Sequence, residues 1–331
     1  MTEEYGLLII MPAHNEAEYV KNTIYSIPKK VDLIIFVNDG STDSTDKIAK
    51  EALIGRNWCD LASKNSKNKF KIINQKNLGV GAAVFNGMKE VLNLEKNNTL
   101  KKLFPKKKKW IIIIMDADGQ MDPNDIDELI KPIRLNSIDH VKGNRIGFKG
   151  MPITRRFGSF LLKNLMRFAS GYNKINDPQC GYRAINLEMI KKWDFTKSWN
   201  DFGYTNWWLL ESGRKGYKLE EVPIKSIFND KKSKLRIRSF LPKVSLLIFI
   251  KLWERGIEWY IFGKGGTHFS TRALVSLFWI ISLFSSAGVF LSVDLWYFYL
   301  LCSIIGFTIT KQLDNNEIER RRKSGSPPII N

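Results

Sequence analysis

Short apolar runs alternate with helical patterns through the first half of the chain, and this alternation restricts the fold more than any other feature. The apolar runs cover residues 7–11, 31–37, 70–73 and 110–115. The helical patterns between and after them cover residues 16–26, 44–53, 80–92 and 123–135. Each run is bounded by turn residues and has the length of a buried parallel strand. The sequence therefore predicts an α/β fold, a Rossmann-like, mostly parallel sheet with helices on both faces.

The composition changes near Pro242. Between residues 241 and 264 the charged residues form one stripe along a predicted helix and the aromatic and aliphatic residues form another. An amphipathic helix of this kind suits a membrane interface, although a helix that covers a domain's own core has the same pattern. The segment 94–109, which ends in four lysines, is predicted to be an exposed surface loop, with contact to lipid as the alternative.

Two uncharged segments follow, about 273–291 and 295–310. At 1.5 Å per residue the first spans about 28 Å, which is enough for the hydrocarbon layer of a membrane. Residues 272–311 are therefore predicted to be a hairpin of two transmembrane helices; a hairpin buried in a soluble protein is the alternative. Arg272, Lys311 and residues 320–323 flank the hairpin, and Asp294 lies at its turn. This distribution places both ends on the cytoplasmic side.

The overall charge and the cysteines limit the classes of partner and compartment. The chain has 52 Lys and Arg against 33 Asp and Glu, a formal net charge of +19, which attracts nucleic acid, anionic lipid or phosphorylated substrates. No RNA- or DNA-binding motif is present, so nucleic acid is not an expected partner. Cys59, Cys180 and Cys302 form no CxxC pair, which argues against a zinc site or a disulfide framework and favours a reducing compartment.

Asp116, Asp118 and Gln120 form the central candidate site, because they follow the most apolar predicted strand. Ligands bind at the carboxyl ends of strands in an open α/β sheet. Two carboxylates one residue apart, with a neutral amide oxygen beside them, suit Mg²⁺ or Mn²⁺ held jointly with a diphosphate. The three histidines are scattered and offer no zinc site.

Other polar motifs follow the neighbouring strands and are expected at the same sheet edge. They are MPAHNE at 11–16, NDGSTD at 38–43, NLGVGAA at 77–83 and GNR at 143–145. The Asp39 carboxylate can accept a hydrogen bond from a base or ribose. Gly79 and Gly81 allow the backbone to approach phosphate near a helix N-terminus. Each motif alone is compatible with ordinary turn chemistry, but together they predict a nucleotide site.

With these motifs the sequence resembles the inverting family 2 glycosyltransferases of GT-A fold, and among them the dolichyl-phosphate mannose or glucose synthase type, from Leu7 to about Ile237. MPAHNE resembles the family's first donor motif, NDGSTDST its nucleoside motif with Asn38 where Asp is commoner, and DADGQMDP its metal motif. The resemblance implies these donor-binding residues: Pro12, Ala13, Asn15, Glu16, Asn38, Asp39, Gly79, Gly81, Asp116 and Ala117. It implies a metal ion at Asp116, Asp118 and Gln120.

Later segments extend the resemblance. DPQCGYRAI, residues 177–185, is similar to the acceptor side of these enzymes, and residues 203–224 to the helix and strand that follow. The basic run 232–237 resembles a loop near the donor phosphates, which implies that Lys234 and Arg236 close over the diphosphate. The Gln-x-x-Arg-Trp motif of processive relatives is missing from the sequence, and single-sugar transfer is therefore favoured.

The predicted reaction is attack by a lipid phosphate on the anomeric carbon of a nucleotide sugar, with inversion. The predicted catalytic residues are Asp118, Arg145 and Asp177, where Asp177 either orients hydroxyl groups or caps a loop. Arg145, Arg155 and Arg156 are the candidates for holding the acceptor phosphate, because guanidinium groups bind phosphate in fixed geometry. The apolar stripe of the helix 154–170 lies either at the membrane or in the core.

The leading prediction is a membrane-bound hexosyltransferase that moves one sugar from UDP-glucose, UDP-GlcNAc or GDP-mannose to dolichyl or another polyprenyl phosphate. Its domains are a cytoplasmic catalytic domain at 1–240, the interface helix at 241–264, the hairpin at 272–311 and a basic cytoplasmic tail at 312–331. The alternatives are transfer to another membrane glycan or glycolipid, and a basic membrane adaptor without enzymatic activity. Self-association into a homo-oligomer stays open.

Overall fold

The computed structural model describes residues 4–63, 68–145, 153–195, 198–201, 203–225, 227, 237–264, 266–291 and 294–324, with the backbone alone at 153–158, 237–241, 322 and 324. The chain divides into two compact units. The first comprises Met1–Asn164, Lys174–Leu209 and Lys218–Ser245, and the second comprises Leu165–Asn173, Leu210–Tyr217 and Leu246–Asn331.

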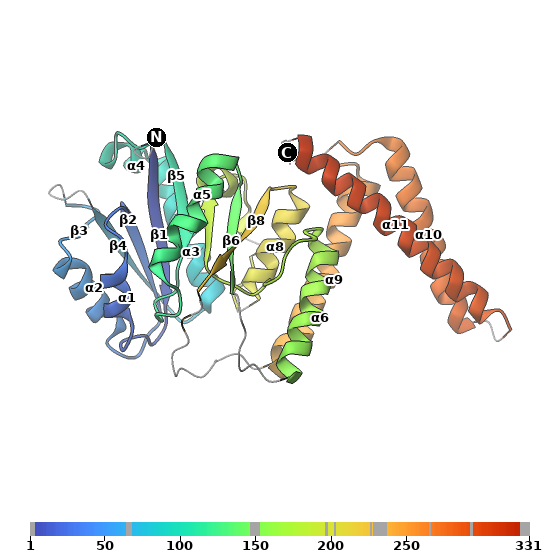
Figure 1. Cartoon of the computed structure of the whole chain (residues 1–331), viewed down its shortest axis with the longest axis horizontal. Helices are drawn as coiled ribbons and strands as arrows, with labels where there is room; N and C mark the ends of the chain where they lie inside the picture. Colours follow the sequence, from blue (N-terminus) through green and yellow to red (C-terminus); the bar gives the residue numbers. More distant parts are fainter. Residues whose placement is uncertain are drawn as a thin grey trace. The chain divides into compact units, whose positions relative to one another are not determined.

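An eight-stranded sheet organises the first unit (Figure 1), in the order β3-β4-β2-β1-β5-β7-β6-β8. The strands are β1 (Tyr5–Ala13), β2 (Leu33–Asp39), β3 (Cys59–Asp60), β4 (Lys69–Gln75), β5 (Lys109–Ile114), β6 (His140–Arg145), β7 (Arg183–Asn186) and β8 (Leu219–Ile224). Only β7 runs antiparallel to its neighbours among these strands. The predicted α/β fold with a mostly parallel sheet is confirmed. The sequence did not predict the two-residue strand β3 or the reversed strand β7.

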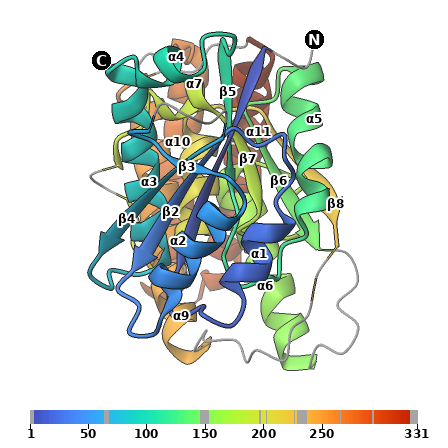
Figure 2. The same ribbon diagram turned by 90° about the vertical axis from the view of Figure 1, so that its left-hand side faces the viewer.

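Helices cover both faces of the sheet, as predicted (Figure 2). The helices of this part of the chain are α1 (Val20–Ser26), α2 (Thr45–Gly55), α3 (Val80–Lys96), α4 (Thr99–Leu103), the 3₁₀ turn η1 (Pro123–Asp125), α5 (Ile126–Asn136), α6 (Ile153–Ser170), α7 (Leu187–Ile190) and α8 (Tyr204–Arg214). Residues of α1, α2 and α5 pack on Ile9, Ile34 and Ile113 in one buried cluster. On the other face, Gly87 of α3 lies against Ile10. A sheet covered on both faces explains why the strands β1 and β5 are apolar in nearly every position.

The segment 94–109 is not the plain exposed loop that the sequence predicts. Its first residues complete α3, and residues Thr99–Leu103 form α4. Lys107 donates a hydrogen bond to the Tyr5 carbonyl at 3.0 Å and lies 3.5 Å from Asp32. The turn is therefore fastened to the amino end of β1, and Lys106, Lys108 and Lys109 are exposed.

The second unit is helical, with α9 (Ile237–Gly256) entering it and η3 (Ile257–Ile261), α10 (Phe269–Leu291) and α11 (Trp296–Ser324) within it. Helices α10 and α11 pack closely, because Ser286 and Ser303 share a hydrogen bond at 2.7 Å and Gly306 lies against Ser282. Small residues allow this approach. The two helices pack on each other, but the predicted hairpin of two transmembrane helices is not confirmed.

Of the described helices, only Phe269–Leu291 is long and apolar enough to cross a membrane, judged by length and composition. The second predicted span, 295–310, is not confirmed. Helix α11 continues through Lys311 to Ser324 without a break, and its second half is polar. Asp314 there accepts a hydrogen bond from Arg255 at 2.7 Å. The apolar part of α11 is thus shorter than the helix. The uncharged run in the sequence does not show where the helix that contains it ends.

The stripe of charge in the segment 241–264 is turned inward. Arg255 is paired with Asp314, Lys251 with Glu254, and Arg214 of α8 with Glu258. The apolar residues Leu246, Phe249 and Ile250 of α9 are instead 51–59% exposed. Leu247 and Ile248 of the same helix are buried, so α9 buries charge and exposes part of its apolar surface, unlike an ordinary surface helix in water.

Candidate active site

The polar motifs meet at one edge of the sheet because the strands that carry them are parallel. Strands β1, β2, β4, β5 and β6 end at Ala13, Asp39, Gln75, Ile114 and Arg145. In Figure 1, β1 runs downward from the N-terminus, so this edge is the lower one. Strand β7 runs the other way, which brings the segment before it, residues 177–182, to the same edge. The juxtaposition predicted from the sequence is therefore observed.

Asp116, Asp118 and Gln120 lie in a tight loop directly after β5, and all three are half-buried. The Asp118 Oδ1 atom accepts a hydrogen bond from the Gln120 amide at 3.0 Å, and Gly119 supplies the positive φ of 74° that the turn requires. The Asp116 amide donates to the Met121 sulfur at 3.2 Å. Both carboxylates are held by the loop at the carboxyl edge of the sheet.

The donor set of this loop fits a hard divalent cation. Among the described residues no group of three or more His, Cys, Asp or Glu side chains could hold a metal by itself. Mg²⁺ in proteins is commonly bound through one or two carboxylates completed by water and substrate phosphate, so two carboxylates and an amide oxygen are sufficient. The loop therefore suits a metal that arrives with a phosphate ligand, and it does not suit a permanent metal cage.

A buried cation lies behind Asp116, and the sequence analysis did not select it. Arg183 is fully buried, donates to the Cys180 and Gly181 carbonyls at 2.8 and 3.2 Å, and lies 5.6 Å from the Tyr204 ring. Burial lowers the pKa of Arg183, and the negative charge of Asp116 opposes this effect. Arg183 is part of the quoted motif DPQCGYRAI, so its charge was visible in the sequence, but its burial was not.

Gly181 lies close to both Tyr204 and Asp116. A Cβ atom there would lie 3.1 Å from the Tyr204 hydroxyl and 3.7 Å from Asp116 Oδ2. Burial, followed by the charge of Asp116, raises the pKa of Tyr204 well above its usual value. Tyr204 is therefore a neutral hydroxyl beside the acidic loop at physiological pH.

Arg145 and Asp177 form a bidentate ion pair at the end of β6. Arg145 Nε donates to Asp177 Oδ2 at 2.6 Å and Nη2 donates to Oδ1 at 2.9 Å. Burial by itself raises the pKa of the Asp177 carboxyl, but the hydrogen bonds from Arg145 outweigh it and the pKa is lowered. The Arg145 side chain is 37% exposed while that of Asp177 is 5% exposed. Asp177 thus contacts Arg145, and Arg145 is the member of the pair that solvent reaches.

The first two donor motifs are fastened to each other by side chains. Asn15 Oδ1 accepts from the Thr42 amide at 2.8 Å, and the Asn15 amide donates to Ser41 Oγ at 3.0 Å. Asn38 donates to Asn74 Oδ1 at 3.1 Å and accepts from the Ser41 amide at the same distance. The polar residues of the motifs therefore hold the loops at this sheet edge in place, in addition to lining the edge.

Four of the predicted donor residues present little or no side chain to a ligand. Pro12, Ala13 and Ala117 are buried, and the Ala117 amide donates to the Pro12 carbonyl at 3.3 Å. Glu16 is 8% exposed, and its amide donates to Thr45 Oγ1 at 2.8 Å. Contacts of Pro12, Ala13 and Ala117 with a donor would be made by backbone.

Asp39 acts on the protein itself. Its carboxylate accepts hydrogen bonds from the Leu78 amide at 2.8 Å, the Gly79 amide at 3.0 Å and Gln75 Nε2 at 2.7 Å. Asp39 is 3% exposed. It holds the loop between β4 and α3 against β2, whereas the sequence predicted a contact with base or ribose, which stays a prediction.

Gly79 and Gly81 are also explained by contacts within the chain. A Cβ atom at Gly79 would lie 2.5 Å from the Asn200 carbonyl oxygen, and one at Gly81 would lie 2.3 Å from that of Trp199. The Ala82 amide donates to the Asn200 carbonyl at 3.1 Å. The start of α3 is therefore approached by protein backbone, and the predicted approach of phosphate to these glycines stays a prediction.

Four predicted basic residues cannot be placed in the site. Lys234 and Arg236 lie outside the described residues. Arg155 and Arg156 belong to the first turns of α6, residues 153–158, where only the backbone is described. Their roles at the diphosphate and at the acceptor phosphate stay predictions.

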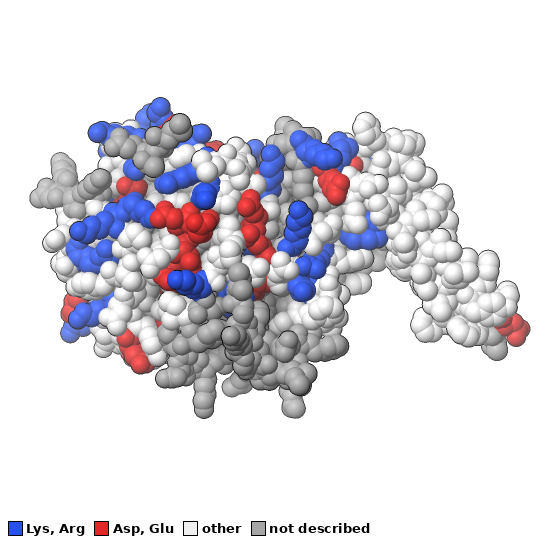
Figure 3. Space-filling model, in the orientation of Figure 1, with Lys and Arg blue, Asp and Glu red and all other residues white. Residues whose placement is uncertain are grey.

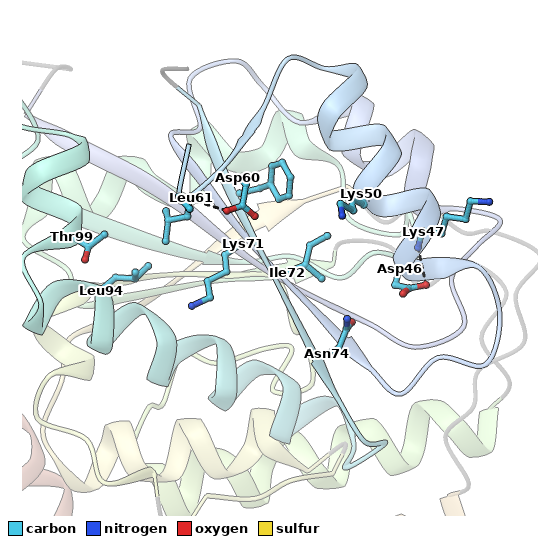
Figure 4. A pocket seen from close by; sticks show the side chains of 12 residues that line it. Asp46, Lys47, Lys50, Asp60, Leu61, Lys71, Ile72, Asn74, Leu94 and Thr99 are labelled. Carbon is cyan, nitrogen blue, oxygen red and sulfur yellow. Dashed lines mark hydrogen bonds between the residues drawn. The ribbon is translucent and has the colours of Figure 1, made fainter. Parts of the chain in front are cut away.

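A hollow of about 790 Å³ lies elsewhere, along the open edge of β4 (Figure 4). Lys47 and Lys50 of α2, Asp60 and Lys71 are among the residues that line it. Strand β3 pairs with β4 at Lys69 and Phe70, and no other described strand pairs with this edge of β4. None of the predicted site residues lines this hollow.

The fold and the site define an α/β protein with an Asp-x-Asp loop at the carboxyl end of its central strand and a cationic side chain at the same edge. Comparison with known proteins gives the family. The chain belongs to glycosyl transferase family 2, whose model matches residues 8–194. It is therefore a glycosyltransferase. The alternative prediction of a membrane adaptor without enzymatic activity is set aside.

Two relatives are similar to this chain to a comparable degree. One is the UDP-N-acetylglucosamine–dolichyl-phosphate N-acetylglucosaminyltransferase of Methanococcus voltae, 31% identical over 232 residues, which are 68% of this chain and 86% of the relative. The other is an uncharacterized protein of Methanocaldococcus jannaschii, 29% identical over 229 residues, 68% of this chain and 82% of the relative.

Among solved structures, glucosyl-3-phosphoglycerate synthase of Mycobacterium tuberculosis in complex with UDP matches with a TM-score of 0.52 and 18% identity, over 76% of this chain and 79% of that one. The same enzyme with Mn²⁺, UDP and phosphoglyceric acid gives the same TM-score and identity, over 76% and 78% of the chains. At this identity the likeness shows the fold alone.

Proposed function

We propose that this protein transfers one sugar from a nucleoside diphosphate sugar to a polyprenyl phosphate such as dolichyl phosphate. The observation that carries the proposal is the arrangement at the sheet edge, where a loop with two carboxylates and the exposed part of Arg145 follow strands of the same direction. The Methanococcus relative, named for transfer of N-acetylglucosamine to dolichyl phosphate, makes UDP-GlcNAc the first donor to test. UDP-glucose and GDP-mannose come next.

Asp116, Asp118 and Gln120 would hold Mg²⁺ or Mn²⁺, as inferred from their oxygen donors and their place in one loop. Such an ion, when bound with the donor, neutralises the diphosphate and makes the nucleoside diphosphate a better leaving group. The loops fastened by Asn15, Asn38 and Asp39 form the side of the edge proposed for the nucleoside. Lys234 and Arg236 are proposed to close over the diphosphate.

The acceptor needs a cation and no base. A phosphate monoester is already anionic near neutral pH, so Arg145 has only to hold it and orient one oxygen toward the anomeric carbon. That oxygen forms the new bond to the anomeric carbon while the bond from this carbon to the diphosphate breaks. The nucleoside diphosphate leaves with the electron pair, and the configuration inverts. Arg155 and Arg156 are proposed as further contacts of the phosphate.

The proposed acceptor is a membrane lipid, and three described helices support a membrane location. Helix α10 is the candidate span. The α9 residues Leu246, Phe249 and Ile250 are more than half exposed, and Phe160 and Phe168 of α6 are 59% and 46% exposed. Figure 3 shows almost no charged side chains on the visible surface of α10 and of the first half of α11, apart from the acidic residue near their turn. Large apolar surface of this kind marks contact with membrane or protein.

We infer a multi-pass arrangement in which the apolar part of α11 forms a second span and the catalytic part, residues 1–240, is cytoplasmic. The segment 241–264 would then lie at the interface, 272–311 in the bilayer and 312–331 on the cytoplasmic side. Arg272 and Lys311 at the two ends of the hairpin and Asp294 at its turn support this orientation.

The test uses the full-length protein in membranes. Membranes containing the protein are incubated with each labelled donor, Mg²⁺ or Mn²⁺ and dolichyl phosphate, and the lipid product is identified by mass. A product that disappears with chelator and in Asp118→Ala, but persists in Asp127→Ala, supports the proposal; Asp127 is an exposed carboxylate on α5 paired with Lys30. Sugar transfer to a membrane glycolipid without transfer to any polyprenyl phosphate would replace the proposal with the alternative acceptor.

A further inference from the structure

A buried ion pair lies directly beneath the strand end that carries Arg145. Lys142 of β6 and Glu221 of β8 are paired residues of two parallel strands, and Lys142 Nζ lies 2.9 Å from Glu221 Oε1. Their side chains are 0% and 8% exposed. Such a pair is weak evidence for stability, because desolvation offsets most of its attraction, so its position calls for another explanation.

Both members of the pair also bind the backbone that precedes β7. Glu221 Oε2 accepts from the Asn176 amide at 2.7 Å, and Oε1 accepts from the Asp177 amide at 3.1 Å. Lys142 Nζ donates to the Asp177 carbonyl oxygen and to the Gly143 carbonyl oxygen at 3.2 Å. The peptide groups on both sides of Asp177 are thus hydrogen-bonded to fixed charges on two strands.

The segment held in this way presents the Asp177 carboxylate to Arg145. That carboxylate accepts two hydrogen bonds from the Arg145 guanidinium, at 2.6 and 2.9 Å, and one from the Arg145 amide at 3.4 Å. Two parallel bonds between a planar guanidinium and a carboxylate fix orientation as well as distance. A movement of Asp177 would therefore turn or release the guanidinium.

We propose that Glu221 and Lys142 are positioning residues for the acceptor phosphate: they lock the backbone at residues 176–177, Asp177 orients Arg145, and Arg145 binds the phosphate monoester. This inference rests on the proposed function and deepens it. Neither residue touches the acceptor. Asp177, predicted from the sequence as a catalytic residue that orients hydroxyl groups, becomes a positioning residue as well.

The test compares Glu221→Gln with Glu220→Gln. The two glutamates are neighbours on β8, and alternation along a strand points their side chains to opposite faces. Gln keeps the size of Glu but removes its charge and one acceptor oxygen. Loss of a hydrogen bond to a buried charged group costs about 1–3 kcal/mol, which corresponds to about a ten- to a hundredfold change in an equilibrium constant. Glu221→Gln should therefore raise the KM for dolichyl phosphate by about that factor. The KM for the nucleotide sugar should stay within about twofold, as should both constants in Glu220→Gln.

A double-mutant cycle separates positioning from a general loss of structure. Arg145→Ala should raise the KM for dolichyl phosphate at least as much as Glu221→Gln, and Glu221→Gln should have almost no further effect in the Arg145→Ala background. Additive effects, or equal losses in both KM values, would overturn the inference. An unchanged acceptor KM in Arg145→Ala would also overturn it, while transfer to dolichyl phosphate would still support the proposed function.

A spectroscopic measurement does not depend on turnover. The Arg145 Nε–H group, identified with Arg145→Lys, should give a shifted and slowly exchanging proton signal in ¹⁵N-labelled protein in detergent. This signal should be lost or moved in Glu221→Gln and kept in Glu220→Gln. If the wild-type protein transfers no sugar to polyprenyl phosphate, the proposed function fails. An unaltered signal in Glu221→Gln shows in either case that Glu221 does not hold Arg145, and overturns the inference.

Discussion

Replacement of Asp39 by Asn tests whether this residue of the nucleoside motif holds the protein or the ligand. The carboxylate uses both oxygens: Oδ1 accepts from the Leu78 amide and Gln75, and Oδ2 accepts from the Gly79 amide. Asn has one oxygen, so the best arrangement keeps the first two bonds and turns an NH₂ group toward the Gly79 amide. One buried donor then loses its partner, and two charge-assisted bonds become neutral.

The expected loss of stability follows from these three bonds. An unsatisfied buried donor costs about 1–3 kcal/mol, and each change from a charge-assisted to a neutral bond costs about 1 kcal/mol, which gives about 3–5 kcal/mol in total. For a unit of this size each kcal/mol shifts the unfolding midpoint by about 2–4 °C. The midpoint of Asp39→Asn should therefore fall by about 6–20 °C.

The assay is thermal unfolding of the full-length protein in detergent, with Asp46→Asn as the control. Asp46 is exposed on α2, and its carboxylate accepts a hydrogen bond from the Lys47 amide at 2.8 Å, so this variant removes a charge without releasing the loop. Binding of UDP is measured by calorimetry on the same samples. If Asp39→Asn unfolds at the temperature of Asp46→Asn but no longer binds UDP, the carboxylate contacts the ligand and the reasoning is refuted.

Three further predictions concern other contacts of the structure. Gly81→Ala brings a Cβ atom to 2.3 Å from the Trp199 carbonyl oxygen, so the backbone must shift; the free energy of unfolding should fall by about 1–3 kcal/mol and sugar transfer should fall with it. Gly306→Leu prevents the close approach of α11 to Ser282 of α10, and should make the hairpin more accessible to protease in detergent; cleavage at the wild-type rate would contradict this prediction. Asp177 has a lowered pKa despite its burial, because guanidinium hydrogen bonds outweigh desolvation. The stability from its ionised form is present above the unfolded pKa of about 3.9 and is lost as the pH falls through the lower folded pKa; the midpoint difference between wild type and Asp177→Asn should be constant from pH 8 to about pH 5 and shrink below about pH 4.

Much of the sheet and the position of the site could be predicted from local pattern. Apolar runs of strand length with turn residues after them are visible in the sequence, and parallel strands bring their carboxyl ends together without further information. Strand β7 was not predicted, because a four-residue strand, Arg183–Asn186, has no apolar run of its own and exists only by pairing with β5 and β6. The second membrane span was not confirmed, because the uncharged run 295–310 is short and belongs to a helix, α11, whose remaining residues are polar.

Pairing between distant residues decided the rest of the candidate site. Asp39 and Asp177 are residues that could bind a ligand. In the structure, however, the Asp39 carboxylate accepts hydrogen bonds from the Leu78 and Gly79 amides, and the Asp177 carboxylate accepts them from Arg145. The glycines of the helix 80–96 region look suited to phosphate, yet Trp199 and Asn200 approach them. A sequence shows which groups can donate or accept, but only the fold shows which of these groups are already used.

The sequence by itself determined the class of fold, the family, and the loop of Asp116, Asp118 and Gln120 at the end of a buried strand, because these depend on residue type and spacing over a few turns of chain. The tertiary structure decided which cation faces that loop and how it is held. Arg183 is buried next to Asp116. Arg145 is partly exposed and is hydrogen-bonded to Asp177, whose backbone in turn is bound by Glu221 and Lys142. Lys142 and Glu221 alone are 79 positions apart in the sequence. Burial and the pairing of charges are properties of contacts, and the strand order that creates those contacts is not written in any local segment.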